Sequence, residues 1–154
     1  MGDRVAPRIP SQMLDLSIRA TAACKGRFIE GMLFQHVRYS CRPRLVEGYT
    51  CGLGRHAGFR RHLERWLPAD EIDTEEYLLV IDDPGTVGCL AFLAREALGD
   101  PQAYAVPHTD WWSIRLGRGF DMDIDYSEKL PGSEVEAWVA ALEAVAKRSG
   151  EMAG

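Results

Sequence analysis

The sequence predicts an α+β domain in which helices pack on one face of an antiparallel sheet of three to five strands, giving two layers. The clearest support is at residues 120–126, where apolar and acidic residues alternate strictly, as they do along a half-buried strand. Two shorter strand-like runs precede it, as in a meander. Helix-start signals stand before the apolar segments that follow Asp83 and Ser133.

Length and composition indicate one folded domain. The chain has 154 residues, of which 46% are hydrophobic and 27% charged. We therefore predict a single domain over 1–154, with residues 1–10 as a flexible N-terminus. No apolar run reaches membrane-spanning length and no secretory segment is visible, so we expect a cytoplasmic protein without a membrane partner. The cysteines lack a C-x-x-C pair and predict reduced thiols.

The N-terminal elements are expected as follows. Ser11 is a candidate cap for a helix that runs to about Cys24. Residues 27–39 favour a strand, although their period is poor, and the glycine-rich segment 40–54 predicts a loop. Residues 55–67 predict an amphipathic helix, because Phe59, Leu63 and Trp66 would share one stripe.

The C-terminal elements have sharper signals. A short strand is expected at 77–81, and Asp82-Asp83-Pro84 then begins a helix that ends near Gly99. Strands are expected at 103–107, 111–116 and 120–126. Ser133-Glu-Val-Glu136 forms a capping box that opens the last helix.

The charge is divided between the two halves of the chain. Residues 1–66 contain 12 Lys and Arg against 5 Asp and Glu, whereas residues 67–154 contain 6 against 18. Strand geometry would place three carboxylates in a row on one face, which predicts a solvated face or a partner-binding surface. The predicted partner-binding residues are Asp121, Asp123, Asp125, Trp111 and Trp112.

The basic segment at residues 38–65 offers an alternative surface. Arginine suits bidentate contacts with phosphate or carboxylate groups, and aromatic residues are interleaved with the arginines. The alternatives are internal pairing with the acidic half, a protein partner, or a nucleic acid. The candidate nucleic-acid-binding residues are Arg55, Arg60, Arg61 and Arg65.

Metal-binding and catalytic patterns are weak. Cys41, Cys51, His56 and His62 are zinc-ligand types, but their spacing matches no finger or ribbon. No cofactor or metal is therefore expected. An enzyme with a site around Cys51, His56 or His108 ranks last among the hypotheses, because no nucleophile motif is present.

The segment DDPGTVGCLAFLAREALGDP at residues 82–101 resembles a pattern in small uncharacterised phage and prophage proteins of high-GC bacteria. In those proteins a similar helix is followed by a tryptophan-containing hairpin and an Ala/Glu-rich helix, and residues 82–146 follow this layout. The resemblance implies a bacterial host and a non-enzymatic protein that binds a host protein or nucleoprotein complex. Inhibitors of host defence, including anti-CRISPR proteins, belong to that class.

Overall fold

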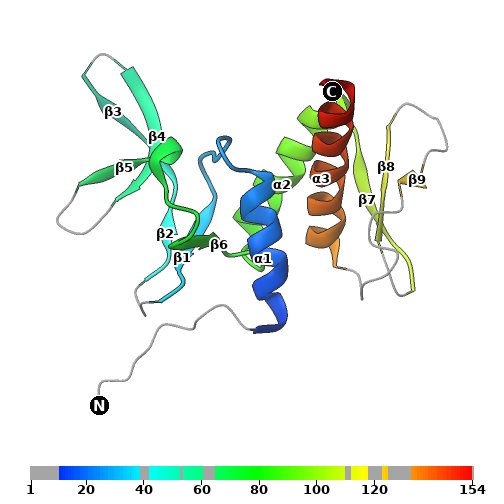
Figure 1. Ribbon diagram of the computed structural model, residues 1–154, viewed down its shortest axis with the longest axis horizontal. Coiled ribbons are helices and arrows are strands. Elements are labelled where there is room, and N and C mark those ends of the chain that lie inside the picture. The colour runs from blue at the N-terminus through cyan, green and yellow to red at the C-terminus, as the bar shows by residue number, and fades with distance from the viewer. Residues whose placement is uncertain are drawn as a thin grey trace. The chain divides into compact units, whose positions relative to one another are not determined.

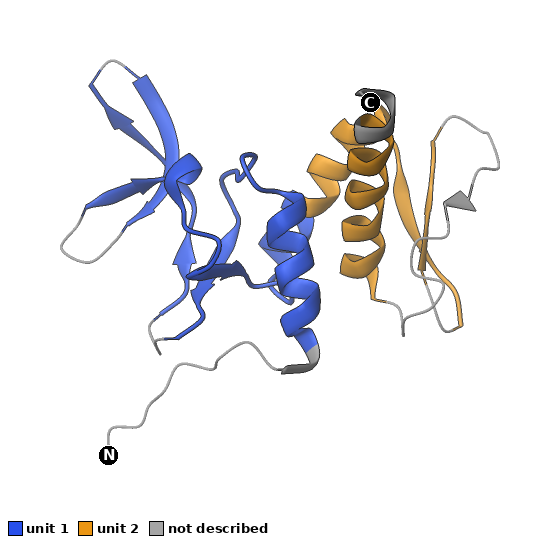
Figure 2. Cartoon of the chain, in the orientation of Figure 1, with its two compact units in different colours: residues 1–89 blue, residues 90–154 orange. Residues whose placement is uncertain are grey.

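The computed structural model describes residues 11–38, 42–52, 54–60, 65–109, 112–117, 123–124 and 133–153 (Figure 1). The chain divides into two compact units, residues 1–89 and residues 90–154 (Figure 2). Within the described ranges, none of the helices is long and apolar enough to cross a membrane. The predicted flexible segment 1–10 lies outside the described residues, and the single domain stays a prediction.

The first unit begins with helix α1 (Ser11–Ala23), which packs on a three-stranded sheet of order β2-β1-β6. The strands are β1 (Leu33–His36), β2 (Arg44–Leu45) and β6 (Tyr77–Leu79), and both pairings are antiparallel. The buried Thr21 hydroxyl donates to the Ser17 carbonyl at 2.7 Å and accepts from the Leu79 amide at 3.0 Å. This side chain therefore joins the helix to β6 with well-formed hydrogen bonds.

The second sheet of this unit is an antiparallel meander of order β3-β4-β5, followed by the short helix η2 (Ala69–Glu71). Its strands are β3 (Glu47–Cys51), β4 (Gly54–Arg60) and β5 (Trp66–Pro68). Phe59 of β4 is fully buried, and its ring lies 6.0 Å from Phe34 and 5.0 Å from Tyr77 between centroids. The two sheets of the unit therefore share one aromatic core.

Helix α2 (Pro84–Leu98) begins where the sequence predicts. The Asp83 carboxylate accepts from the Thr86 amide at 2.9 Å, which is the N-cap interaction expected of an aspartate before proline. The Thr86 hydroxyl in turn accepts from the Leu33 amide at 2.9 Å, so the helix start is tied to β1. Gly99 has φ +69° and ends the helix, as expected for a glycine at this position.

The second unit packs helix α3 (Glu134–Ala153) against β7 (Tyr104–Pro107) and β8 (Trp112–Arg115). The sheet has the order β7-β8-β9, where β9 is Asp123–Ile124. Trp138 is buried on α3 and donates its indole hydrogen to Glu134 at 3.1 Å. Arg95 lies 5.1 Å from the Trp138 ring centroid and donates to the Ala103 carbonyl at 2.7 Å, which links α2, α3 and the segment before β7.

The α+β class is confirmed, with helices packed on antiparallel sheets, and the described strands are distributed over three sheets. The predicted helix at 11–24, the strand at 77–81 and the two later helices are present with small shifts of their ends. The Glu136 amide donates to the Ser133 hydroxyl at 3.3 Å, as a capping residue requires. The strand expected at 27–39 is limited to Leu33–His36.

The helix predicted at 55–67 is wrong, as is the loop predicted at 40–54. Residues 54–60 form β4 and pair with β3, and Gly52 in the intervening turn has φ +65°, which allows the chain to reverse. Phe59 and Trp66 were expected on one helical stripe. The strand register instead turns Phe59 toward the buried face and Trp66 toward the opposite face.

Asp100 provides a test of the second unit. It is 3% exposed, and its carboxylate accepts from the Gln102 amide at 2.9 Å and the Gly117 amide at 2.8 Å. Asp100→Ala leaves these donors without their acceptors, so we expect the free energy of unfolding to fall by about 1–3 kcal/mol in urea titrations. Glu96→Ala, an exposed change near the end of α2, should shift it by less than about 0.5 kcal/mol. Equal effects of the two variants would show that Asp100 does not hold this turn.

Candidate functional site

The solvent-facing side of the β3-β4-β5 sheet carries a group of aromatic and basic side chains. Antiparallel pairing places Tyr49 opposite His56 and Trp66 opposite Arg60, and side chains in such pairs lie on the same face of a sheet. Tyr49 and Trp66 are half-buried, while His56 and Arg60 are exposed. We call these four residues the aromatic face.

The four side chains of the aromatic face form a continuous column. The Tyr49 and Trp66 rings are stacked, with centroids 4.5 Å apart and an interplanar angle of 9°. His56 lies 5.6 Å from Tyr49 between ring centroids, and the Arg60 guanidinium carbon lies 5.1 Å from the Trp66 centroid. Stacking and cation–π contacts hold a rigid apolar ridge in place on this surface.

Gly58 makes the column possible. It occupies the central strand between His56 and Arg60, on the same face, and it is buried. A Cβ atom at this position would lie 3.0 Å from Tyr49 Cε1 and would overlap the Leu67 carbonyl oxygen. The absence of a side chain therefore lets the rings from the two outer strands meet above β4, as in other sheets where an aromatic ring covers a glycine.

Acidic groups act on Tyr49, within this column. Partial burial and the negative charges of Cys51, Glu71 and Asp70 raise the pKa of Tyr49. A tyrosine phenol is already a neutral hydrogen-bond donor near neutral pH, and the raised pKa extends this state to more alkaline solution. The surface that Tyr49 presents is a mixed one, with apolar rings, a hydroxyl donor, a cationic end at Arg60 and nearby carboxylates.

The predicted basic surface is divided between the two faces of this sheet. Arg55 and Arg60 lie on opposite faces of β4, because side chains alternate along a strand. Arg55 forms an ion pair with Glu30 at 3.5 Å, whereas Arg60 covers Trp66. Arg65 is exposed just before β5, and Arg61 lies outside the described residues. The structure thus brings one of these arginines, Arg60, into the aromatic face.

The predicted acidic row falls mostly outside the described part of the chain. Asp121, Asp125 and Trp111 are not among the described residues. Asp123 belongs to β9 and pairs in register with Arg115, and Trp112 is half-buried in β8. The proposed partner-binding role of this row stays a prediction.

Among the candidate catalytic groups, Cys51 and His56 are exposed on the β3-β4 hairpin, and His108 lies beside a buried serine. The His108 Nε2 atom lies 2.9 Å from the Ser113 hydroxyl, and Ser113 is 0% exposed. Within the described ranges, no group of three His, Cys, Asp or Glu side chains is arranged to hold a metal ion. Cys41 and His62 lie outside those ranges.

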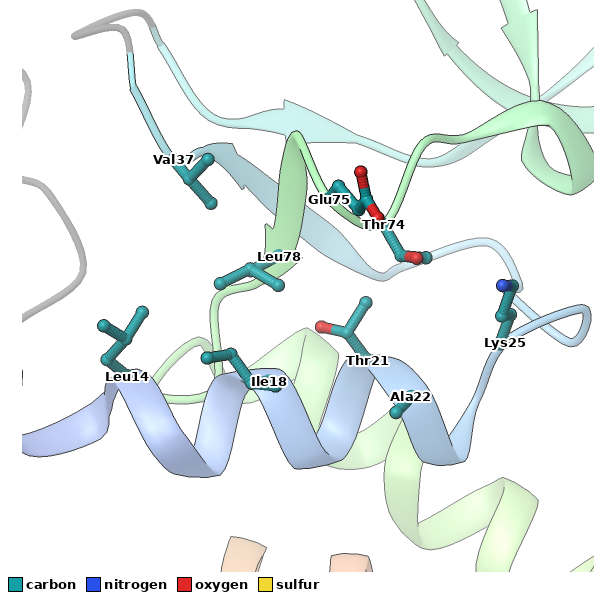
Figure 3. Close-up of a pocket in the computed structure, with 9 residues that line it drawn as sticks. All are labelled: Leu14, Ile18, Thr21, Ala22, Lys25, Val37, Thr74, Glu75 and Leu78. Carbon is teal, nitrogen blue, oxygen red and sulfur yellow. The ribbon is translucent and has the colours of Figure 1, made fainter.

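An apolar groove lies between α1 and β6 (Figure 3). Its volume is about 540 Å³. The α1 side of the groove includes Leu14 and Ile18, which are 38% and 47% exposed. Val37, Leu78, Thr74 and Glu75 line the other side, and Lys25 stands where α1 ends.

Neither the aromatic face nor the groove was predicted from the sequence. A signal for the face is nonetheless present, since residues 54–60 alternate between two sets of side chains, with His56, Gly58 and Arg60 in one set. No comparable sequence signal marks the groove, because its two sides come from segments distant in the chain.

Comparison of the chain with protein-family models, with curated proteins and with solved structures found no match.

The reactivity of the cysteines tests the burial and protonation of their thiols. Burial raises the pKa of the Cys24 thiol to about 12, with Arg27 opposing the shift, and burial together with Asp83 raises the pKa of Cys89. Both groups therefore remain protonated thiols at neutral pH, and thiols are poor nucleophiles compared with thiolates. Cys51 is exposed. In timed iodoacetamide labelling at pH 8, read peptide by peptide, we expect Cys51 to be modified before Cys24 and Cys89.

Cys24 and Cys89 should then be labelled only at the rate at which the protein opens, and urea should accelerate their labelling while changing Cys51 little. Labelling of Cys24 as fast as that of Cys51 in the folded protein would contradict the described burial.

Proposed function

We propose that this protein is a non-enzymatic binding protein that engages another protein through the aromatic face. The observation that supports this is the Tyr49–Trp66 stack, which holds two large rings in fixed positions on a solvent-facing sheet. Tryptophan, tyrosine and arginine are the residues most often responsible for affinity at protein interfaces. A ridge that is already ordered also loses little conformational entropy on binding.

The charges near the ridge favour a protein over a nucleic acid. A polyanion is attracted by a row of cations on one face, but Arg55 and Arg60 point to opposite faces and Arg55 is paired with Glu30. Carboxylates also lie close enough to Tyr49 to raise its pKa. Residues 1–89 contain 12 Lys and Arg and 12 Asp and Glu, so this unit has no excess positive charge. A mixed surface is typical of protein–protein contacts.

The resemblance of residues 82–146 to phage and prophage proteins suggests the origin of the partner. We propose a bacterial host protein or nucleoprotein complex, and inhibition of host defence, as by anti-CRISPR proteins, as the biological setting. The acidic row at Asp121, Asp123 and Asp125 would then provide electrostatic attraction to a basic partner, while the aromatic face provides the apolar contact.

The experiment is capture of partners from a bacterial lysate by the immobilised chain, at low and high salt and with or without nuclease. Trp66→Ala should reduce the captured partner about tenfold or more, because a central tryptophan carries a large share of binding energy. The matched control is Arg55→Ala on the opposite face of the same sheet, which should change capture less than about twofold. Thermal melts of both variants establish that the fold is retained.

Other outcomes separate the alternatives. A second outcome is capture that survives Trp66→Ala but is lost at high salt. If capture is also lost when Asp121, Asp123 and Asp125 are all changed to Asn, the acidic row and not the aromatic face is the interface. Capture that is abolished by nuclease and unchanged by Trp66→Ala would support the nucleic-acid alternative and contradict the proposal.

A further inference from the structure

The aromatic face offers the edges of its rings to a partner more than their flat sides. Trp66 is stacked on Tyr49 and lies under the Arg60 guanidinium, and the other neighbour of Tyr49 in the column is His56. The flat sides of both rings are therefore largely occupied within the column. The edge of an aromatic ring carries partial positive charge, so the surface that is left attracts carbonyl oxygens.

Two polar groups of the column have no partner within the described part of the chain. Neither the Tyr49 hydroxyl nor the Trp66 indole N–H donates a hydrogen bond to a described residue. The indole of the buried Trp138, by contrast, donates to Glu134. Tyrosine and tryptophan at interfaces commonly use these groups to bind the other protein. The aromatic face thus combines apolar rings with two donors that a partner's acceptors can satisfy.

We infer, building on the proposed function, that the part of the partner that contacts the aromatic face is an extended, proline-rich segment. Such a segment forms a polyproline II helix, which has no internal hydrogen bonds, so its carbonyls are free to accept from Tyr49 and Trp66. Proline rings supply the apolar contact with the aromatic side chains. An α-helix has already paired its carbonyls, and an added strand would lie at the edge of the sheet and not over its face.

Carboxylates close to Tyr49 favour a basic residue beside the prolines. Glu47 lies two residues before Tyr49 on β3, and therefore on the same face of the sheet. Asp70 and Glu71 follow β5 in η2, are exposed, and act on the Tyr49 phenol through their charges. These groups would attract a lysine or arginine of the partner and repel an acidic residue at the same position.

Fluorescence anisotropy of labelled synthetic peptides measures this preference directly. The first peptide has two arginines followed by about eight prolines, which extend roughly 25 Å and so exceed the roughly 10 Å across three strands. The comparison peptide keeps the length and the arginines but replaces the prolines with alternating glycine and serine. The proline peptide should bind at least about tenfold more tightly, because it is already extended and loses less entropy. Replacing its arginines with glutamates should weaken binding about threefold or more.

Substitutions in the chain locate the binding site of the peptide. Trp66→Ala removes both a ring and a donor, and should weaken binding of the proline peptide about tenfold or more. Tyr49→Phe keeps the ring and removes only the hydroxyl, so the expected loss is about two- to tenfold. Arg55→Ala, on the opposite face of the same sheet, is the matched control and should change binding less than about twofold.

The inference is overturned if the two peptides bind equally, or if neither Trp66→Ala nor Tyr49→Phe weakens binding of the proline peptide. The proposed function is then decided separately by capture from the lysate. Capture that still depends on Trp66 would leave the aromatic face as the binding surface for a partner of another shape. Capture that is independent of Trp66 would contradict both the inference and the proposed function.

Discussion

The bare backbone at Gly58 is the constraint on which the candidate site depends. It allows the rings of Tyr49 and Trp66, which come from the two outer strands, to stack 4.5 Å apart over the central strand. Any side chain at this position would displace one ring and overlap the Leu67 carbonyl oxygen, to which β4 lies very close. The shape of the solvent-facing surface thus depends on a single residue without a Cβ atom.

Strand β4 connects this surface to the core of the first unit. On one side, Phe59 enters the aromatic cluster with Phe34 and Tyr77, which are residues of the other sheet. On the opposite side, the same strand carries His56 and Arg60 beside the stacked rings. Because the buried side of β4 is anchored in a packed core, the aromatic face is held rigidly, and a rigid surface binds with a smaller loss of entropy.

The sequence predicted the features that depend on local chemistry. Asp83 before Pro84, Ser133 as a cap and Gly99 at a helix end act within a few residues, and the structure has all three. The hairpin of β3 and β4 was missed because it depends on pairing between segments and on space above Gly58. The spacing of Phe59 and Trp66 imitated a helical stripe, although the strands send these side chains to opposite faces. The groove was missed because α1 and β6 are distant in sequence.

The central claim is that the β3-β4-β5 sheet provides the contact with a partner. Hydrogen–deuterium exchange of the chain, alone and in complex with a partner purified by capture, measures this directly, because amides covered on binding exchange more slowly. The account predicts slower exchange in residues 47–60 and 66–68 in the complex. Slower exchange confined to residues 111–125, with β3, β4 and β5 unchanged, would contradict it and would identify the acidic strand region as the interface.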